Sequence, residues 1–297
     1  MKMKYKWTPE GLESRGRYLW NAELVPVLYR HLRVEPGIVA VDVGCGSGFF
    51  TRIIAKGLQN HGRVIGVDVN KKLLVAATEI ARREDMSTLI EFKEGNAYNL
   101  PLPSDFADLV ACHTLLYILG KPIKALNEMV RVAKVGGRVA AVESDYSGCV
   151  IYDPFDKDYG ELAYKFNKAV IGSFKKLYSA DLTIGSKLPS MFLKAGLVEI
   201  TAHAYLLPTR PLTWDNRYSI EELVDHYKHS ISELISWTET EKRAMEEYGV
   251  SRSEFDEYQL KTVKRIKNWI KNPKKMRNHA FISARCFFVC VGKKTKF

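Results

Sequence analysis

At residues 41–48 the chain reads Val-Asp-Val-Gly-Cys-Gly-Ser-Gly. These residues end an apolar run that begins at Ile38, and a helical pattern starts directly after them at Phe49. A strand that breaks into a glycine-rich turn and then feeds a helix is typical of a binding loop for a nucleoside-containing ligand. The free N–H groups at the start of such a helix suit an anionic or polar ligand group.

The sequence on both sides of this loop alternates between strand and helix patterns. We expect helices over 49–59, 71–83 and 122–133. The strands expected around them span residues 38–43, 63–68, 88–93, 107–112 and 138–143. Strand, helix and strand in succession predict right-handed parallel crossovers and a doubly wound α/β sheet, whose ligands lie beyond the carboxyl ends of the strands. Two later strands, 197–206 and 281–291, bring the mostly parallel sheet to seven strands.

The remaining segments predict three parts. A helical N-terminal arm, 1–35, is expected to act as a lid over the loop. The core comprises 36–206 and 280–297, with an insertion at 145–178, and a second, helical and basic insertion occupies 207–279. Both insertions leave strands on the ligand side of the sheet, so we expect them over the active-site face, where they would select the substrate.

The spacing of the glycines excludes a dinucleotide fingerprint, because its third glycine would fall on Phe49. The pattern Asp-x-Gly-x-Gly-x-Gly from Asp42 instead resembles motif I of the class I S-adenosylmethionine-dependent methyltransferases. Further elements follow in that family's order: Asp68, Gly95-Asn96-Ala97, Asp108-Leu109-Val110 and Lys134-Val135-Gly136-Gly137. The resemblance covers about residues 36–206 and is closest to the ubiquinone/menaquinone-biosynthesis type.

This resemblance implies S-adenosylmethionine as cofactor, S-adenosylhomocysteine as product and no metal. Asp68 is expected to accept hydrogen bonds from the ribose hydroxyls. Asn96 stands where the family usually has Asp, and it keeps a carbonyl acceptor for the adenine amine. The cofactor-binding residues expected together are Asp42, Gly44, Cys45, Gly46, Gly48, Asp68, Val69, Asn96, Ala97 and His113.

Methyl transfer is an in-line displacement, so the enzyme mainly positions the acceptor and excludes water. An amine acceptor needs only a route for its proton, whereas a hydroxyl or carbon acceptor needs activation. The candidate catalytic residues near the strand ends are His113, Glu143, Asp145 and Tyr146. His113 suits either a general base or a packed, hydrogen-bonded role, and the apolar neighbours of Cys112 favour a buried residue over a nucleophile.

The net charge of +11 is unevenly distributed. Residues 258–297 hold 12 Lys/Arg and no acid, whereas residues 1–257 hold 33 Lys/Arg and 34 Asp/Glu. A helix over 255–271 places apolar side chains on one arc and cations on the other. We expect an RNA partner for this face, with binding through Lys261, Lys264, Arg265, Lys271, Lys274 and Lys275.

These features predict a methyltransferase that acts on a base of a structured RNA, ribosomal or transfer. The alternative is a small-molecule acceptor of the quinone type or another metabolite, with the basic face either docked on an anionic membrane or merely solvated. A binding protein that keeps the cofactor pocket is a third interpretation. No apolar run approaches the roughly 18 residues of a membrane span, so a cytoplasmic protein is expected. The oligomeric state does not follow from the sequence.

Overall fold

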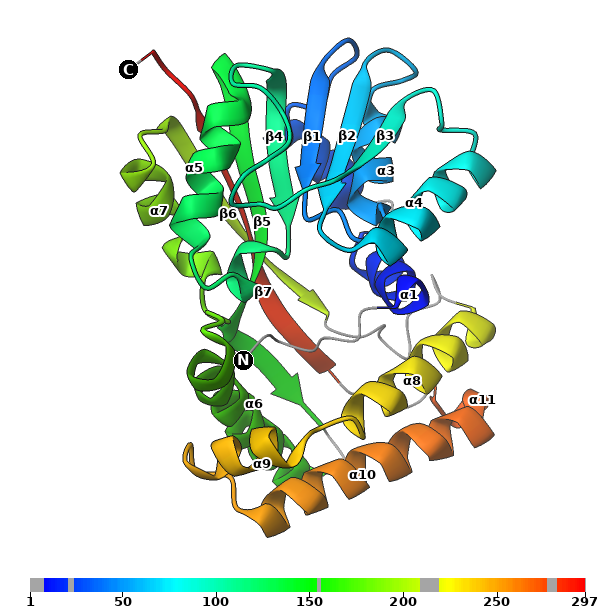
Figure 1. Cartoon of the computed structure of the whole chain (residues 1–297). Coiled ribbons are helices and arrows are strands. Elements are labelled where there is room, and N and C mark those ends of the chain that lie inside the picture. Colours follow the sequence, from blue (N-terminus) through cyan, green and yellow to red (C-terminus); the bar gives the residue numbers. More distant parts are fainter. Residues whose placement is uncertain (1–7, 21–23, 154–155, 209–218, 277–281, 297) are drawn as a thin grey trace. The chain divides into compact units, whose positions relative to one another are not determined.

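The computed structural model of the chain forms two compact units (Figure 1). The larger unit comprises Lys4–Ser144, Thr183–Tyr205 and Phe287–Phe297. The smaller comprises Met1–Met3, Asp145–Leu182 and Leu206–Cys286. The structure describes residues 8–20, 24–153, 156–208, 219–276 and 282–296.

The strands form one seven-stranded sheet in the order β3-β2-β1-β4-β5-β7-β6. Their bounds are Val39–Val43 (β1), Arg63–Asp68 (β2), Ile90–Glu94 (β3), Ala107–His113 (β4), Ala133–Tyr152 (β5), Val198–Pro208 (β6) and Ile282–Lys293 (β7). The strands β3, β2, β1, β4 and β5 run parallel. The predicted doubly wound, mostly parallel α/β sheet is therefore confirmed. The central strands β1 and β4 are almost entirely buried, as expected for parallel strands covered on both faces.

The helices of the larger unit begin where their sequences supply a start signal. Their bounds are Pro9–Leu19 (α1), Leu24–Leu32 (α2), Phe49–Gly57 (α3), Lys71–Arg83 (α4), Pro122–Val132 (α5) and Leu188–Lys194 (α7). Proline stands in the first turn of α1, α5 and α7, where its missing N–H costs no hydrogen bond. Asn70 caps α4 by accepting hydrogen bonds from the N–H groups of Lys72 and Leu73.

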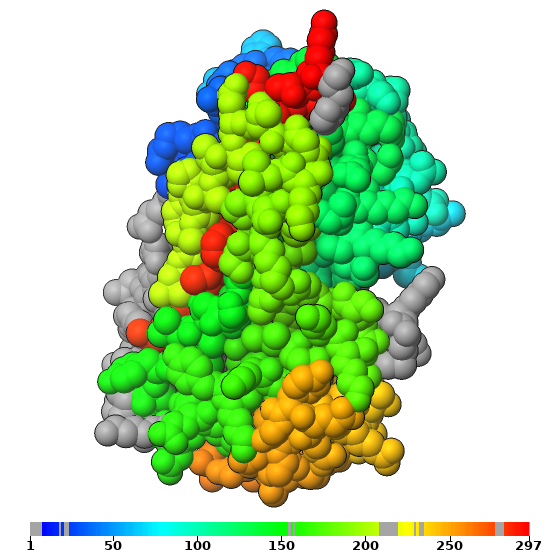
Figure 2. All heavy atoms as spheres, turned by 90° about the vertical axis from the view of Figure 1, so that its left-hand side faces the viewer, coloured from blue at the N-terminus to red at the C-terminus, as the bar shows by residue number. Residues whose placement is uncertain are grey.

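The smaller unit is mostly helical. It holds α6 (Lys157–Tyr178), α8 (Ile220–Leu234), α9 (Glu239–Glu246), α10 (Arg252–Lys271) and α11 (Pro273–Met276). Helices α9 and α10 both begin with a capping box, Thr238 with Glu241 and Ser251 with Glu254. Helix α6 packs against α9 and α10, and α10 packs against α8. In Figure 2 the orange surface of α9 and α10 adjoins the green surface of α6.

The core of the smaller unit joins the two segments that the sequence presents as separate insertions. Tyr159 and Ala163 of α6 are buried together with Tyr227 of α8 and with Ile266 and Trp269 of α10. The two segments thus share one apolar core. Residues 209–218 and 277–279 of the second insertion lie outside the described residues.

Two boundaries differ from those expected. Strand β5 does not end at residue 143 but continues to Tyr152, through a stretch rich in strand-forming side chains such as Val150 and Ile151. The expected N-terminal arm contains two helices, α1 and α2, and its residues 1–7 and 21–23 lie outside the described part. The roles of the arm as a lid and of the second insertion in substrate selection remain predictions.

Candidate functional site at the glycine loop

The glycine loop connects β1 to α3 and depends on the absence of side chains. Gly44 and Gly48 adopt positive φ angles of 74° and 77°. A Cβ atom on Gly44 would lie 2.6 Å from Cδ1 of Leu115, and one on Gly48 would lie 2.7 Å from Cζ of Phe92. Both the backbone conformation and the packing around the loop therefore require glycine.

Asp68, at the end of β2, holds this loop in place. Its Oδ2 accepts a hydrogen bond from the N–H of Gly46 at 2.9 Å, and its Oδ1 accepts one from the N–H of Asn70 at 2.8 Å. The carboxylate is only partly buried, and Val69 beside it is 69% exposed. Each carboxylate oxygen keeps a further lone pair, so Asp68 fits a ligand that presents a pair of hydroxyls, as a ribose does.

Asp42 lies beneath the loop in the interior. It is 1% exposed, its Oδ2 accepts a hydrogen bond from Oγ1 of Thr51 at 2.6 Å, and its Oδ1 has no hydrogen-bond partner. Burial raises the pKa of Asp42 to about 7. This carboxyl therefore ties the strand to α3. Cys45, also expected to contact the cofactor, is buried beside it, and burial raises the pKa of its thiol.

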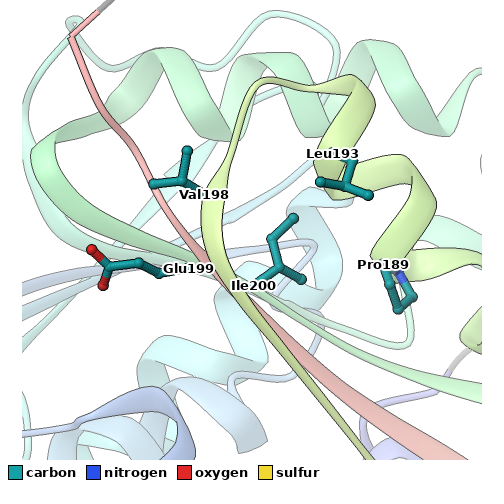
Figure 3. A pocket seen from close by; sticks show the side chains of 5 residues that line it. All are labelled: Pro189, Leu193, Val198, Glu199 and Ile200. Carbon is teal, nitrogen blue, oxygen red and sulfur yellow. The ribbon is translucent and has the colours of Figure 1, made fainter.

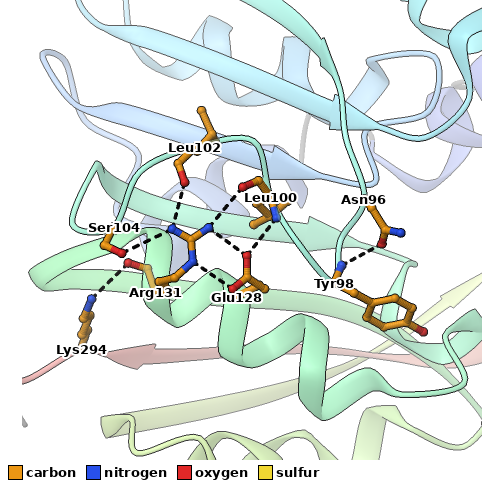
Figure 4. Close-up of polar contacts among 8 residues, drawn as sticks. All are labelled: Asn96, Tyr98, Leu100, Leu102, Ser104, Glu128, Arg131 and Lys294. Carbon is orange, nitrogen blue, oxygen red and sulfur yellow. Dashed lines mark hydrogen bonds and ion pairs between the residues drawn. The ribbon is translucent and has the colours of Figure 1, made fainter.

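The loop after β3 carries Asn96, which is labelled in Figure 4, and Ala97. Asn96 is exposed, and its Oδ1 accepts a hydrogen bond from the N–H of Tyr98 at 2.9 Å, which leaves one lone pair and the amide donors for a ligand. Ala97 is buried. Arg131 of α5 fixes the following turn by donating to the carbonyls of Leu100 and Leu102 at 3.2 and 2.9 Å.

Glu143, on β5, carries a fully buried carboxyl in the larger unit. Its Oε1 accepts hydrogen bonds from the N–H groups of Leu115 and Leu116 at 2.9 and 2.7 Å, while its Oε2 has no partner. Burial raises the pKa of Glu143 to about 7. The Cys112 thiol lies 3.8 Å from Oε1, and burial raises the pKa of this thiol well above its usual range, so it stays protonated rather than nucleophilic.

His113, at the end of β4, is packed among aromatic rings. Its Nε2 accepts a hydrogen bond from Nε1 of Trp20 at 3.2 Å, and its ring stacks on Phe50 with centroids 5.2 Å apart. Burial, with a smaller effect from the charge of Arg15, lowers the pKa of His113 to about 3. The imidazole is therefore neutral, and the Trp20 indole occupies its basic nitrogen.

The other two catalytic candidates belong to the smaller unit and have partners there. Asp145 is 1% exposed, and its Oδ1 accepts a hydrogen bond from the N–H of Ser147 at 2.9 Å. The guanidinium of Arg285 lies 3.4 Å from the ring centroid of Tyr146. These contacts hold both side chains against their own unit.

Helix α1 of the N-terminal arm contacts the glycine loop directly. Glu13 accepts a hydrogen bond from Oγ of Ser47 at 2.7 Å and pairs with Arg52 at 2.5 Å. The side chain of Arg52 is 3% exposed, donates to the carbonyl of Ser47 at 2.9 Å and pairs with Glu84 at 3.2 Å. Sequence reasoning missed this network, although a single cation in the apolar start of α3 was a signal for it.

A pocket of about 380 Å³ lies elsewhere in the larger unit, between α7 and β6 (Figure 3). It is lined by Pro189, Leu193, Val198, Glu199 and Ile200, none of which is an expected site residue. Glu199 pairs with Lys293 at 2.8 Å. Within the described ranges no cluster of three or more His, Cys, Asp or Glu side chains is arranged to bind a metal. None of the described helices combines the length and the apolar character needed to cross a membrane.

The cations expected on α10 and α11 differ in their surroundings. Lys261 pairs with Glu257 at 2.9 Å. Arg265 turns inward, where it pairs with the buried Asp153 at 2.6 Å and lies 4.0 Å above the ring of Tyr159. The remaining expected cations, Lys264, Lys271, Lys274 and Lys275, are exposed.

Comparisons with known proteins identify the family of the chain. A family model described as a methyltransferase domain matches residues 41–141. A demethylmenaquinone methyltransferase of Lysinibacillus sphaericus is 30% identical over 186 residues, which are 59% of this chain and 76% of that protein. Other relatives, from Geobacillus and Shouchella clausii, carry the same name. An uncharacterized methyltransferase of Schizosaccharomyces pombe is 37% identical over 124 residues, covering 40% of this chain and 44% of its own length.

Among solved structures, the phosphoethanolamine N-methyltransferase 2 of Haemonchus contortus in complex with S-adenosyl-L-methionine superposes with a TM-score of 0.55. The two chains are 15% identical, and the match covers 99% of this chain and 59% of the other. At this identity the likeness shows the fold alone.

The expectation of an RNA acceptor was wrong. Relatives that match most of their own length are named for a quinone, demethylmenaquinone, and not for RNA. The structure gives a physical reason: Arg265 and Lys261, two of the six cations assigned to RNA, are paired with acids of the chain itself. A helical wheel can show the pair of Glu257 and Lys261, four residues apart, but not the pair of Arg265 and Asp153, which are distant in the sequence.

Proposed function

Because the chain belongs to the class I S-adenosylmethionine-dependent methyltransferases, we propose that it methylates a small-molecule acceptor of the quinone type. Its cofactor is S-adenosylmethionine, whose sulfonium supplies the methyl group. The observation that carries the proposed acceptor is the 30% identity to a demethylmenaquinone methyltransferase over 76% of that protein.

The glycine loop and Asp68 bind the nucleoside part of the cofactor in this proposal. The carboxylate of Asp68 is already oriented by two backbone N–H groups, so hydroxyls bind to it without a loss of side-chain freedom. Asn96, exposed at the end of the neighbouring strand, contributes its remaining lone pair and its amide donors to the base. Helix α1 covers the loop and keeps water from the reacting atoms.

Glu143 is the proposed base. A carbon of a reduced quinone ring becomes nucleophilic when a neighbouring ring hydroxyl loses its proton, and this proton needs an acceptor. A pKa of about 7 suits a group that takes up and releases a proton near neutral pH, and Oε2 has no other partner. Since Glu143 is fully buried, the acceptor reaches it when the loop at Leu115 and Leu116 moves aside.

The test is an assay of the purified chain with S-adenosylmethionine and demethylmenaquinone, with the acceptor kept reduced by dithionite. We expect S-adenosylhomocysteine and a product heavier by one methyl substituent, both measured by mass spectrometry. The same assay without dithionite controls for the need for a ring hydroxyl. A chain that binds the cofactor but methylates no quinol, while methylating another compound in a metabolite extract, would refute the proposed acceptor.

A further inference from the structure

A row of lysines runs along the open side of α10 and continues into α11. We call Lys264, Lys267, Lys271, Lys274 and Lys275 the lysine row. All five side chains are exposed, and none has an ion pair or hydrogen bond within the described residues. The spacing of three and four residues places Lys264, Lys267 and Lys271 along one stripe of α10, and Lys274 and Lys275 follow on α11.

The opposite side of α10 packs into the core of the smaller unit. Phe255, Thr262, Ile266 and Trp269 are buried, and the helix packs against α6 and α8 (Figure 1). The lysine row therefore faces away from the core of the smaller unit. Leu260, one turn before Lys264 on the same stripe, is 68% exposed and adds an apolar side chain to this surface.

The charge of the row exceeds what the helix itself requires. Lysines in the last turn stabilise a helix through its dipole, but this effect fades within one turn. Lys264 and Lys267 stand one to two turns before the C-terminal end at Lys271. The first half of α10 carries Glu254, Asp256 and Glu257, but no Asp or Glu occurs after residue 257. The second half of the helix therefore has no acidic side chain of its own to neutralise its lysines.

The form of the row indicates what binds it. Its part on α10 runs from Lys264 to Lys271, seven residue steps or about 10 Å at the rise of an α-helix, and Lys274 and Lys275 of α11 continue it beyond the size of a single phosphate or carboxylate. It consists of lysines, which are flexible, hydrated point charges, whereas arginine forks are typical of geometrically specific phosphate recognition. The two arginines of this helix are paired with acids of the chain, Arg252 with Glu239 at 2.9 Å and Arg265 with Asp153 at 2.6 Å. A linear set of mobile positive charges fits a flat, diffuse layer of negative charge.

We propose that the lysine row is a docking surface for an anionic lipid bilayer. The inference rests on the proposed quinone acceptor, since a quinone with a long isoprenoid tail resides in the bilayer. Each lysine near an anionic surface strengthens binding about fivefold, and Leu260 contributes apolar contact. Docking keeps the enzyme at the surface from which such an acceptor is taken.

The experiment uses the full chain and co-sedimentation with vesicles that contain no quinone. We expect binding to vesicles of phosphatidylglycerol and phosphatidylcholine at about 0.05 M NaCl, release at about 0.5 M NaCl, and no binding to phosphatidylcholine alone. A variant with all five row lysines changed to Gln is expected to bind at least a hundredfold more weakly. Circular dichroism and binding of S-adenosylmethionine verify that this variant is folded.

The matched control changes five exposed lysines elsewhere to Gln: Lys72, Lys168, Lys175, Lys194 and Lys296. It carries the same net charge as the row variant and is expected to bind vesicles within about threefold of the unmodified chain. Equal losses in the two variants would reduce the effect to net charge and overturn the proposal. Binding to neutral vesicles, or no binding at low salt, would overturn it as well.

A second arm separates this proposal from the proposed function. The row variant is expected to methylate a short-tailed, water-soluble quinol at the unmodified rate, but a long-tailed quinol in anionic vesicles at least tenfold more slowly. If the unmodified chain binds anionic vesicles through the row yet methylates neither quinol, the docking surface stands and the quinone acceptor fails. If both quinols are methylated and the row variant shows no loss with vesicles, the acceptor stands and the docking surface fails.

Discussion

Two buried acids of the larger unit, Asp42 and Glu143, differ in their partners from the buried Asp153 of the smaller unit. In the larger unit, Asp42 and Glu143 are buried with one carboxylate oxygen each lacking a hydrogen-bond partner, and the pKa of each is raised to about 7. In the smaller unit, the buried Asp153 is paired with Arg265 at 2.6 Å. A buried acid without a counter-charge reduces stability, so its presence indicates a function, whereas a paired one stabilises the scaffold. The contrast supports the proposal that the chemistry belongs to the larger unit.

The largest effect is expected from Glu143→Gln. The amide keeps a carbonyl oxygen for the N–H groups of Leu115 and Leu116 but accepts no proton, so the rate of quinol methylation should fall by about 10²- to 10⁴-fold. The same variant should be about 1–2 kcal/mol more stable at pH 8, because it removes a buried charge. Initial rates and urea unfolding measure the two effects.

The exposed Glu91→Gln is the matched control for this variant and should change neither quantity. A Glu143→Gln variant that keeps its activity would assign this carboxyl to the structure of the loop after β4, and the contrast between the units would lose its functional meaning.

The second effect concerns the paired acid of the smaller unit. Arg265→Met leaves Asp153 buried without its counter-charge and should lower the free energy of unfolding by about 3–4 kcal/mol. Lys264→Met, the neighbouring and exposed position, removes the same charge and should cost less than about 0.5 kcal/mol. Urea unfolding of both variants decides the point: equal losses would show that the Arg265 pair does not stabilise this unit.

The third effect is a dependence of stability on pH that arises in the larger unit. Asp42 and Glu143 have raised pKa values of about 7, so between their ordinary values and pH 7 the folded chain binds more protons than the unfolded one, and stability falls as pH rises. His113 has a lowered pKa of about 3, so its contribution is present above its ordinary value of about 6.5 and is lost as pH falls toward 3. As pH rises from 5 to 7, the two carboxyls lower the free energy of unfolding and the imidazole raises it.

The combined effect of the two carboxyls is larger than that of the imidazole. The free energy of unfolding should therefore fall by about 2–3 kcal/mol between pH 5 and pH 7. Urea titrations at several pH values test this in the absence of cofactor. Glu143→Gln should reduce the slope, whereas Glu91→Gln should leave it unchanged. A stability that rises over this range would mean that the two carboxyls are less buried than the structure has them.

The sequence revealed the larger unit well because its signals are local. Apolar runs of five to seven residues, glycine turns and the cap at Asn70 each depend on neighbours in the chain, and strand β2 and helix α4 match the expected ranges 63–68 and 71–83. Of the expected site residues, the structure brings the glycine loop and Asp68 into direct contact, and their binding of the cofactor remains a prediction.

The contacts that sequence reasoning missed join distant segments. The hydrogen bond from Trp20 to His113 and the pairing of Glu13 with Arg52 depend on how α1 packs, which no local pattern encodes. The helical wheel placed Arg265 on the charged arc of α10, whereas in the structure its side chain turns inward. Its neighbour is Asp153, on another segment, and the assignment to RNA failed for that reason.

The smallest effect compares one glycine from each unit. Gly44→Ala places a Cβ at φ 74° and 2.6 Å from Leu115, so we expect a loss of about 2 kcal/mol in stability and about tenfold weaker binding of S-adenosylmethionine. Gly160→Ala lies in α6, where a Cβ meets nothing within 4 Å, and should raise stability by about 0.5–1 kcal/mol without affecting cofactor binding. Urea unfolding and isothermal titration calorimetry measure both quantities. Normal cofactor binding by Gly44→Ala would show that the loop tolerates a side chain where it approaches Leu115. The close packing of the loop would then not be required for binding the nucleoside.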